Sequence, residues 1–325
     1  MLSVASDRPA GQASPNPPGM PPLVVILGPT AVGKTEMALQ LAQHLGGEIV
    51  SADSRLFYRH MDIGTAKPTM AERAAVPHHL IDVANPDEIW SLARFQNEAR
   101  HAIREIHARR RLPFLVGGTG QYIRAVTHGW QPPPVEPDLR LRSALERWAA
   151  EVGAYGLHER LAALDPIAAE KIDPRNMRRT VRAMEVILTS GHRFSQQRLK
   201  APSPFRILQV GLRRPRPELY ARIDRRVSDM IDAGLVEEVR HLLAMGYSPD
   251  LPTLTAIGYR EIIAYLQERL TLEEAVAQIQ RATRVFVRRQ ANWFKLDDPA
   301  IRWFEVGAST LEQVETVIGD WLNFA

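Results

Sequence analysis

The sequence predicts an α/β fold in which a parallel sheet, covered by helices, is interrupted by a helical insertion. Short apolar runs alternate with segments whose apolar residues recur at helical spacing, which is the pattern of strand–helix–strand units. The apolar runs are nearly continuous, as in strands that are buried on both faces and joined by right-handed crossovers. A Pro-rich connector at 128–137 then separates this pattern from an all-helical stretch.

The first strand–helix–strand unit lies close to the start of the chain. Leu23–Leu27 is a run of five apolar residues and predicts a buried strand. Glu36–Leu45 carries apolar residues at helical spacing, and the glycines at 46 and 47 end that helix. Ile49–Ala52 predicts a second, short strand next to it.

The next elements complete the sheet before the insertion. Leu92–Ile106 has one apolar helical face, and Ser91 is placed to cap its N-terminus. Pro113–Val116 predicts a third strand, which runs into the glycine-rich turn Gly117–Gly120.

Beyond the connector, residues 138–191 read as entirely helical, with Gly191 as the C-terminal cap. Phe205–Leu212 returns to strand character, amphipathic helices follow from about Glu218 to Arg289, and Ile301–Val306 predicts a last strand. We therefore expect a core domain formed by residues 23–137 and 192–325, and an insertion domain at 138–191. Residues 1–22 are rich in Pro and poor in apolar side chains, which predicts a disordered tail.

Composition excludes several classes of protein. The chain has 325 residues, 45% hydrophobic and 24% charged, which is typical of a globular protein. Cys is absent, so disulfides, thiolate zinc sites and a cysteine nucleophile are excluded. No apolar run is long enough to span a membrane and the tail does not resemble a signal peptide, so we expect a cytoplasmic protein. A sequence pI near 9.5 leaves a polyanionic partner open.

The strongest motif follows the first strand and matches the phosphate-binding loop G-x-x-x-x-G-K-[ST]. In such a loop the backbone N–H groups and the helix N-terminus hold a diphosphate or triphosphate, Lys34 adds a point charge, and the Thr35 hydroxyl can ligate Mg²⁺. The core is therefore predicted to resemble P-loop NTPases. The residues of the predicted diphosphate site are Gly28, Pro29, Thr30, Ala31, Val32, Gly33, Lys34 and Thr35.

An acidic residue, Asp53, follows the second strand. Because the carboxyl ends of parallel strands meet at one edge of a sheet, Asp53 should face the phosphate loop. Taken alone it would more often be a turn or capping residue, but beside a phosphate loop we favour a catalytic role. In enzymes that hydrolyse or transfer phosphate, an acidic residue at the end of a neighbouring strand usually holds Mg²⁺. The third strand here ends in Gly117-Gly118-Thr119 and not in a carboxylate, which argues against phosphoryl transfer.

Several further segments, taken with the phosphate loop, resemble one family. They are Ser51-Ala52-Asp53-Ser54, Met61-Asp62-Ile63-Gly64-Thr65-Ala66-Lys67-Pro68, Leu115-Val116-Gly117-Gly118-Thr119-Gly120-Gln121-Tyr122, Gly258-Tyr259-Arg260 and Arg288-Arg289-Gln290-Ala291-Asn292-Trp293-Phe294. Together they resemble the bacterial tRNA dimethylallyltransferases, also called tRNA isopentenyltransferases, from about Leu23 to about Trp303.

The resemblance implies transfer of a dimethylallyl group from dimethylallyl diphosphate to N6 of the adenine 3′ of the anticodon (position 37), in tRNAs that read codons beginning with U. It implies Asp53 as the base, Thr30 near the reacting centre, Arg226 on the side of the diphosphate, assistance by Mg²⁺, and a monomer. It also implies contacts with the anticodon stem–loop through four segments and two single residues. These are Asp53, Ser54, Arg55, Leu56; Arg178, Arg179, Thr180, Val181, Arg182; Thr255, Ala256, Ile257, Gly258, Tyr259, Arg260; Arg288, Arg289, Gln290, Ala291, Asn292, Trp293, Phe294, Lys295; and Thr119 and Arg140.

Two departures from the family pattern are visible. Val32 stands where the family commonly has Ser, which removes one hydroxyl from a loop that acts mostly through its backbone. Arg55 stands where Ala or Gln is common and is expected to alter contacts with the bases beside the target. Two alternatives remain open from the sequence: a small-molecule kinase that uses the loop for ATP, and an RNA-binding NTPase that does not modify its partner.

The Arg-rich segments predict a difference in salt sensitivity between the two substrates. Contacts between Arg and RNA phosphates release counterions, so raising salt from about 50 to 200 mM should weaken tRNA binding far more than binding of dimethylallyl diphosphate. Filter binding of tRNA and calorimetry with the diphosphate measure the two slopes. Equal slopes would mean that these segments are not the RNA surface.

Overall fold

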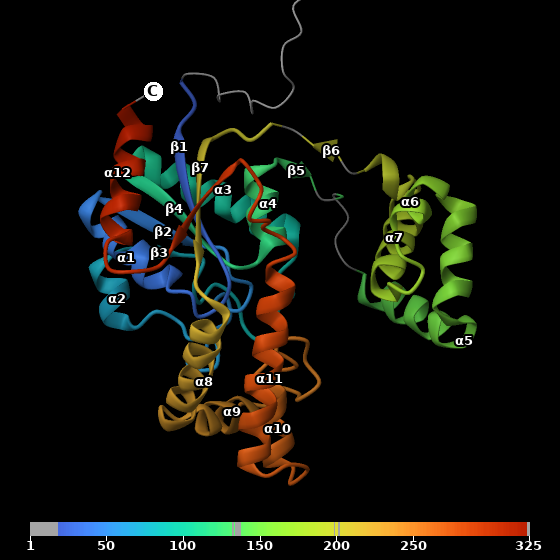
Figure 1. Cartoon of the computed structure of the whole chain (residues 1–325). Helices are drawn as coiled ribbons and strands as arrows, with labels where there is room; N and C mark the ends of the chain where they lie inside the picture. Colours follow the sequence, from blue (N-terminus) through green and yellow to red (C-terminus); the bar gives the residue numbers. More distant parts are fainter. Residues whose placement is uncertain (1–18, 132, 134–137, 198, 201, 324–325) are drawn as a thin grey trace, which may run out of the picture. The chain divides into compact units, whose positions relative to one another are not determined.

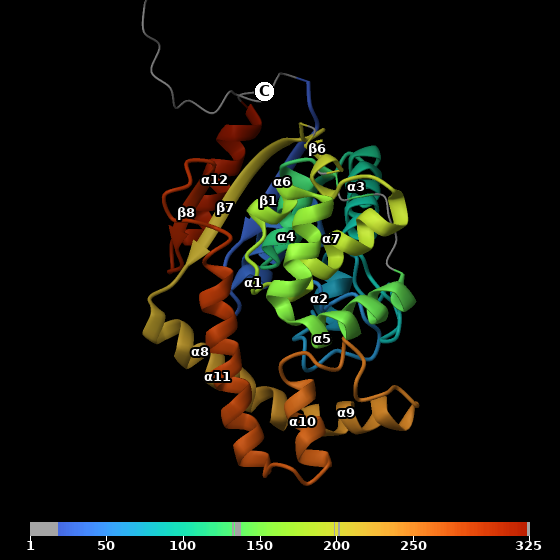
Figure 2. The ribbon, with the colours of Figure 1, turned by 90° about the vertical axis from the view of Figure 1, so that its right-hand side faces the viewer.

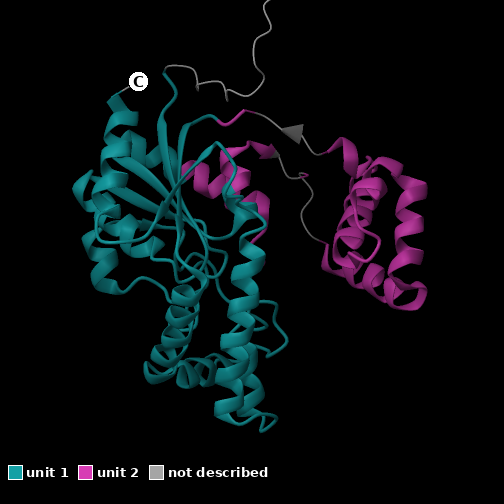
Figure 3. Cartoon of the chain, viewed as in Figure 1, with its two compact units in different colours: residues 1–88, 102–123, 204–325 teal, residues 89–101, 124–203 magenta. Residues whose placement is uncertain are grey.

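The structure is a computed structural model that describes residues 19–131, 133, 138–197, 199–200 and 202–323. Residues 1–18 of the predicted tail, and residues 132 and 134–137 of the Pro-rich connector, lie outside the described residues. The described chain divides into two compact units (Figure 3), one formed by residues 1–88, 102–123 and 204–325 and the other by residues 89–101 and 124–203. The second unit thus extends beyond the helical insertion expected at 138–191.

The first unit contains a six-stranded parallel sheet with strand order β3-β2-β4-β1-β7-β8. Its strands are β1 (Pro22–Leu27), β2 (Gly47–Ser51), β3 (His78–His79), β4 (Leu112–Gly117), β7 (Arg206–Arg213) and β8 (Ile301–Glu305). The five strands predicted from apolar runs are confirmed within two residues at each end. β3, which has only two residues, was not predicted because it is too short to show a pattern.

Helices cover both faces of the sheet (Figure 1). Those of the first unit are α1 (Lys34–His44), α2 (Met70–Ala75), α8 (Arg216–Asp232), α9 (Leu235–Ala244), α10 (Tyr259–Leu266), α11 (Leu272–Gln290) and α12 (Thr310–Asn323), with part of α3 (Leu92–Ala108) and of α4 (Gly120–Thr127). α1 and α12 pack against each other and share one hydrophobic core with β1, β4 and β7. α8 to α11 lie beyond the end at which β7 runs into α8, and α11 lies beside α8 in both views (Figures 1 and 2).

The register of the sheet decides which loops become neighbours. Leu27 at the end of β1 pairs with Gly117 of β4, and Ser51 at the end of β2 pairs with Val116. The N–H of Ala52 continues this ladder by donating to the carbonyl of Val116 at 2.7 Å. The phosphate loop, the Asp53 turn and the turn after β4 therefore leave the sheet side by side at its carboxyl edge.

The second unit contains α5 (Leu139–Leu164), α6 (Pro166–Lys171) and α7 (Met177–Ser190), which share a hydrophobic core of their own. α7 ends at Gly191, whose φ of 71° is the left-handed conformation expected for a glycine cap. The fully buried carboxylate of Glu185 accepts from Arg142 at 2.8 Å and from Arg182 at 2.9 Å. In the described part of the chain, no helix is both long and apolar enough to cross a membrane.

The close contact between β4 and the end of β2 predicts a steric requirement for glycine at position 117. A Cβ there would lie 2.4 Å from the carbonyl oxygen of Ala52. Gly117→Ala should therefore lower the free energy of unfolding by about 1–3 kcal/mol, the usual cost of overpacking. Denaturant unfolding measures the loss, and Gly307→Ala is the control because a Cβ at Gly307 has no neighbour within 4 Å. Equal stability of the two variants would contradict the steric argument.

Candidate active site at the carboxyl edge of the sheet

The phosphate loop connects β1 to α1 and adopts a backbone that needs its glycines. Gly28 and Gly33 have φ values of 151° and 109°, and a Cβ on Gly28 would lie 2.5 Å from the carbonyl oxygen of Leu212. Gly33 is the N-cap of α1 and has no side chain. The first N–H groups of the helix therefore receive no hydrogen bond from a capping side chain and stay available to the loop. This arrangement is typical of an anion site.

Two arginines that the sequence did not single out hold the back of this loop. Arg214 Nε donates to the carbonyl of Val32 at 3.0 Å, and Arg222 Nε donates to the carbonyl of Ala31 at 2.9 Å. The side chain of Val32 is completely buried in the hydrophobic core shared by α1 and the sheet. Val32 therefore packs in the hydrophobic core, where it makes apolar contacts in place of the hydroxyl of the Ser that is common in the family.

Three charged groups converge in front of the loop: Lys34, Asp53 and Arg226. Lys34 Nζ donates to the carbonyl of Pro29 at 2.7 Å. Burial lowers the pKa of Lys34 to about 8, with the Asp53 carboxylate opposing this shift and the Arg226 guanidinium adding to it. Burial also lowers the pKa of Arg226, again opposed by Asp53 and reinforced by Arg222. One carboxylate thus lies within electrostatic reach of two cations that are both partly withdrawn from water.

The Asp53 carboxylate is oriented by the turn that follows β2. Its Oδ1 accepts from the N–H of Arg55 at 3.0 Å, and the N–H of Asp53 donates to Ser51 Oγ at 3.3 Å. The N–H of Ser54 donates to Thr119 Oγ1 at 3.4 Å, which joins this turn to the one after β4. These bonds orient the Asp53 carboxylate and engage its Oδ1 within the turn.

The end of α11 docks on the phosphate loop and on the turn after β4. Gln290 Oε1 accepts from the N–H of Thr30 at 2.9 Å, and Gln290 Nε2 donates to the carbonyl of Gly118 at 3.2 Å. Trp293 covers Gly120 so closely that a Cβ on Gly120 would lie 2.3 Å from its ring. Neither contact is visible in the sequence, because the partners are far apart along the chain.

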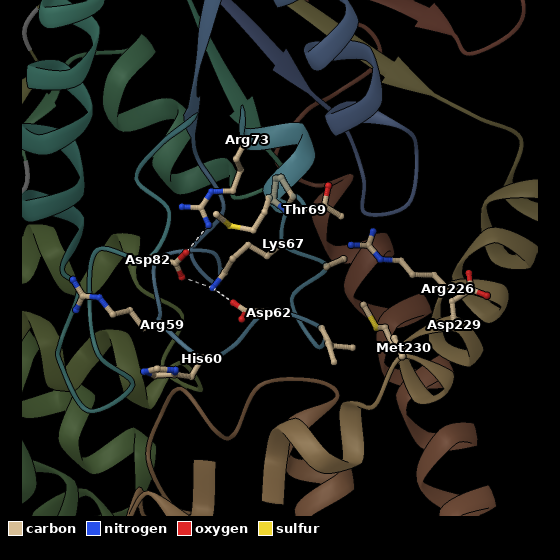
Figure 4. Close-up of a pocket in the computed structure, with 15 residues that line it drawn as sticks. Arg59, His60, Asp62, Lys67, Thr69, Arg73, Asp82, Arg226, Asp229 and Met230 are labelled. Carbon is tan, nitrogen blue, oxygen red and sulfur yellow. Dashed lines mark hydrogen bonds and ion pairs between the residues drawn. The ribbon is translucent and has the colours of Figure 1, made fainter. Parts of the chain in front are cut away.

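A cavity of about 690 Å³ lies next to Arg226 (Figure 4). One wall holds the network of Lys67 with Asp62 and Asp82, and Asp82 also accepts from Arg73 at 2.6 Å. The side chain of Lys67, in the family segment at 61–68, is only 3% exposed. Its charge is paired with the carboxylates of Asp62 and Asp82. The rest of the lining mixes Arg59, His60, Thr69, Arg226 and Asp229 with apolar side chains, and it includes neither Asp53 nor any residue of the phosphate loop. Its apolar side chains are Ile63, Ala66, Pro68, Met70, Met230 and Ala233.

The loop that carries this segment is fixed by Glu238 of α9. One oxygen of the carboxylate accepts from the N–H groups of Asp62 and Ile63 at 2.8 and 2.7 Å, and the other accepts from Gly64 at 3.1 Å and from Tyr259 Oη at 2.7 Å. The fully buried Tyr259 ring occupies the space that a side chain at Gly64 would need. No sequence pattern pointed to Glu238, because a carboxylate on an amphipathic helix is normally solvated.

The residues expected to contact tRNA divide into three groups. The first group has exposed or half-buried side chains on the first unit. Its members are Asp53, Ser54, Arg55, Leu56, Thr119, Thr255, Ile257, Arg260, Arg288, Arg289, Ala291, Asn292, Trp293 and Lys295. The second group has buried side chains, or in the case of Gly258 a buried backbone, and so faces the protein interior. Its members are Thr180, Val181, Ala256, Gly258, Tyr259, Gln290 and Phe294. The third group comprises Arg140, Arg178, Arg179 and Arg182, which belong to the second unit together with Thr180 and Val181.

The described part of the chain contains no metal site made only of protein ligands. Among the described residues, no group of three or more acidic or histidine side chains gathers in a way that could hold a metal ion. The Thr35 hydroxyl lies exposed on the first turn of α1, beside Lys34. One hard oxygen ligand at this position suits Mg²⁺, which keeps several waters and is usually shared with substrate phosphates.

Comparison with known proteins agrees with this geometry. The profile of the family described as IPP transferase matches residues 56–297, and that described as isopentenyl transferase matches residues 21–82. The chain is 53% identical over 305 residues to a tRNA dimethylallyltransferase of Roseiflexus sp. (strain RS-1), covering 94% of this chain and 100% of that protein. This chain belongs to the IPP transferase family.

Solved structures of IPP transferases support the same fold. The tRNA isopentenylpyrophosphate transferase of Bacillus halodurans is 42% identical, with a TM-score of 0.69 over 93% of this chain and 97% of that one. A eukaryotic dimethylallyltransferase acting on tRNA is 25% identical, with a TM-score of 0.76 over 93% and 80%. The predicted α/β core with a parallel sheet is confirmed, and family membership favours the transferase over the kinase.

The low pKa of Lys34 predicts that binding of diphosphate depends on pH. In the free enzyme Lys34 is charged below about pH 8 and loses its proton above it, so affinity for dimethylallyl diphosphate, which is already fully ionised, should fall as the pH rises from about 7.5 to 9.5. Bound diphosphate raises this pKa, so binding near pH 8.5 should take up a proton. Calorimetry in buffers of different ionisation enthalpy measures both effects.

The control for this pH dependence is Lys34→Arg, because a guanidinium keeps its charge across the range. Its affinity for diphosphate should change less with pH than that of the unmodified enzyme. An affinity of the unmodified enzyme that stays constant up to pH 9.5, without proton uptake, would contradict the assignment.

Proposed function

We propose that this enzyme transfers the dimethylallyl group of dimethylallyl diphosphate to N6 of the adenosine at position 37, 3′ of the anticodon, in tRNAs that read codons beginning with U. The products are N6-isopentenyladenosine and diphosphate. The observation that carries the proposal is the electrostatic coupling of Asp53 with Lys34 and Arg226 at the phosphate loop. The names of the relatives support the choice of tRNA as the acceptor.

The chemistry requires a base and an anion site in one place. The lone pair of an adenine amine is delocalised into the ring, so N6 is a weak nucleophile. Asp53 Oδ2 accepts the hydrogen bond of N6–H and takes the proton while the bond between N6 and the allylic carbon forms. The carbon–oxygen bond breaks at the same centre, and its electron pair leaves on the diphosphate.

The negative charge that develops on the diphosphate meets groups that are already in position. Lys34, Arg226 and the N–H groups of the loop stabilise it, and since they are held by the fold they need little rearrangement. Thr30 lies in the same loop, next to the reacting centre. When Mg²⁺ is bound, it neutralises charge on the diphosphate, and Thr35 is the residue that would hold it.

We place the prenyl donor between the phosphate loop and the cavity that Arg226 lines. Arg226 binds the charged end, and the apolar part of the cavity, which includes Ile63 and Met230, receives the dimethylallyl group. The acceptor base is normally stacked in the anticodon loop and has to be extruded to reach Asp53. Exposed Arg288, Arg289 and Lys295 are suited to hold the phosphates of that loop. We further propose a monomeric enzyme that meets its tRNA in the cytoplasm.

The decisive assay incubates the protein with dimethylallyl diphosphate, Mg²⁺ and unmodified tRNA, and analyses the nucleosides by mass spectrometry. Formation of N6-isopentenyladenosine without consumption of ATP supports the proposal. ATP turnover without prenyl transfer would support the kinase or the RNA-binding NTPase instead.

Replacing the proposed base tests its role separately. Asp53→Ala should lower the rate of transfer by roughly 10²–10⁴-fold, since a general base contributes about that much. Binding of dimethylallyl diphosphate should remain largely intact. Asp232→Ala, at the exposed end of α8, is the control and should leave the rate unchanged. A rate for Asp53→Ala close to that of the control would argue against Asp53 as the base.

A further inference from the structure

The C-terminal end of α11 and the residues that follow it present two faces of opposite character. Arg288, Arg289, Asn292 and Lys295 are exposed, whereas Gln290 is only 6% exposed. The exposed face carries the charge expected to meet RNA, and the buried face contacts the phosphate loop. The segment is therefore more than an RNA contact.

Gln290 uses both ends of its amide inside the protein. Its Oε1 accepts from Thr30, the residue in the middle of the phosphate loop, and its Nε2 donates to Gly118 in the turn after β4. Removing the amide leaves the N–H of Thr30 and the carbonyl of Gly118 without this partner, and an unpaired buried donor or acceptor is costly in free energy. The two turns would then be free to shift.

The turn after β4 is shaped to admit this amide. A Cβ on Gly118 would lie 2.5 Å from Gln290 Nε2 and 3.2 Å from the carbonyl oxygen of Gly28. The same turn supplies Thr119 Oγ1 to the N–H of Ser54, next to Asp53. Gln290 therefore connects the diphosphate side of the site, through Gly118 and Thr119, with the side that carries the base.

We propose that Gln290 is a positioning residue that sets the spacing between the phosphate loop and the Asp53 turn, and that it is not an RNA contact. The inference rests on the proposed prenyl transfer and deepens it. Gln290 touches neither substrate and acts through Thr30 and Gly118. Its loss should lower kcat and leave the KM values for both substrates nearly unchanged.

Two substitutions test this role in the full-length enzyme. Gln290→Met keeps the length of the side chain but removes both hydrogen bonds, and should lower kcat by roughly 10–100-fold, the effect of a displacement of about 1 Å in an active site. Gln290→Glu keeps the acceptor for Thr30, and in its protonated form also supplies a donor for Gly118. Burial favours that neutral form, so kcat relative to the unmodified enzyme should recover as the pH falls from about 8.5 to 6.

Gln278→Glu is the matched control, because Gln278 is exposed on the same helix. Its kcat relative to the unmodified enzyme should be close to one at every pH. Melting temperatures report whether each variant folds, and if Gln290→Met does not, the pH profile of Gln290→Glu decides.

Three results would overturn the proposal. One is a kcat of Gln290→Met within about threefold of the unmodified enzyme, since that is far less than the expected loss. Another is an effect confined to KM for tRNA, which would make Gln290 an RNA contact. The third is a kcat of Gln290→Glu, relative to the unmodified enzyme, that does not change with pH. That result would mean that Gln290 contributes by packing and not through its hydrogen bonds.

A separate readout covers the case in which the unmodified enzyme transfers no prenyl group, so that the proposed function fails. Hydrogen exchange of the Thr30 N–H should then still be faster in Gln290→Met than in the unmodified protein. Equal exchange rates would overturn the positioning role independently of the activity.

Discussion

The parallel pairing of β2, β4 and β1 is the constraint on which the site depends. Because β4 lies between the other two strands, the turn after β4 lies between the phosphate loop and the Asp53 turn. Gly117 allows the end of β2 to approach closely, and Leu27 and Ser51 fix the register. The phosphate loop and the Asp53 turn therefore leave the sheet on either side of the glycine-rich turn.

In this arrangement the Asp53 carboxylate interacts electrostatically with Lys34 and with Arg226, without a direct ion pair to either. Burial makes the charged form of Lys34 less favourable, and Asp53 partly offsets that cost. Asp53 opposes the effect of burial at both Lys34 and Arg226 only in part, and a bound diphosphate adds further negative charge beside them. The free site is thus complementary to the charge that develops when the allylic bond breaks, and this favours transfer chemistry.

Much of the fold was predictable because its signals are local. The strands at 23–27, 49–52 and 113–116, and the helix at 92–106, follow from apolar runs and helical spacing. α2 was missed because none of its residues is buried, so it has no apolar face. α12 was also missed, although Val314, Val317 and Ile318 have the spacing of a buried helical face.

The site was predictable only where a motif is contiguous. The phosphate loop and Asp53 lie next to strands in the sequence, so their neighbourhood could be inferred. Gln290, Glu238 and Tyr259 act on residues more than 170 positions away, and their roles depend on packing that no short pattern encodes. Resemblance placed Gln290 and Tyr259 among RNA contacts, whereas both side chains are buried.

The most direct measurement of the central claim is the structure of this enzyme bound to an unreactive analogue of dimethylallyl diphosphate and an anticodon stem–loop. The account predicts the diphosphate against Lys34 and Arg226, and the adenine N6 at roughly 2.6–3.2 Å from Asp53 Oδ2. A diphosphate held away from Lys34, or an extruded base that does not reach Asp53, would contradict it.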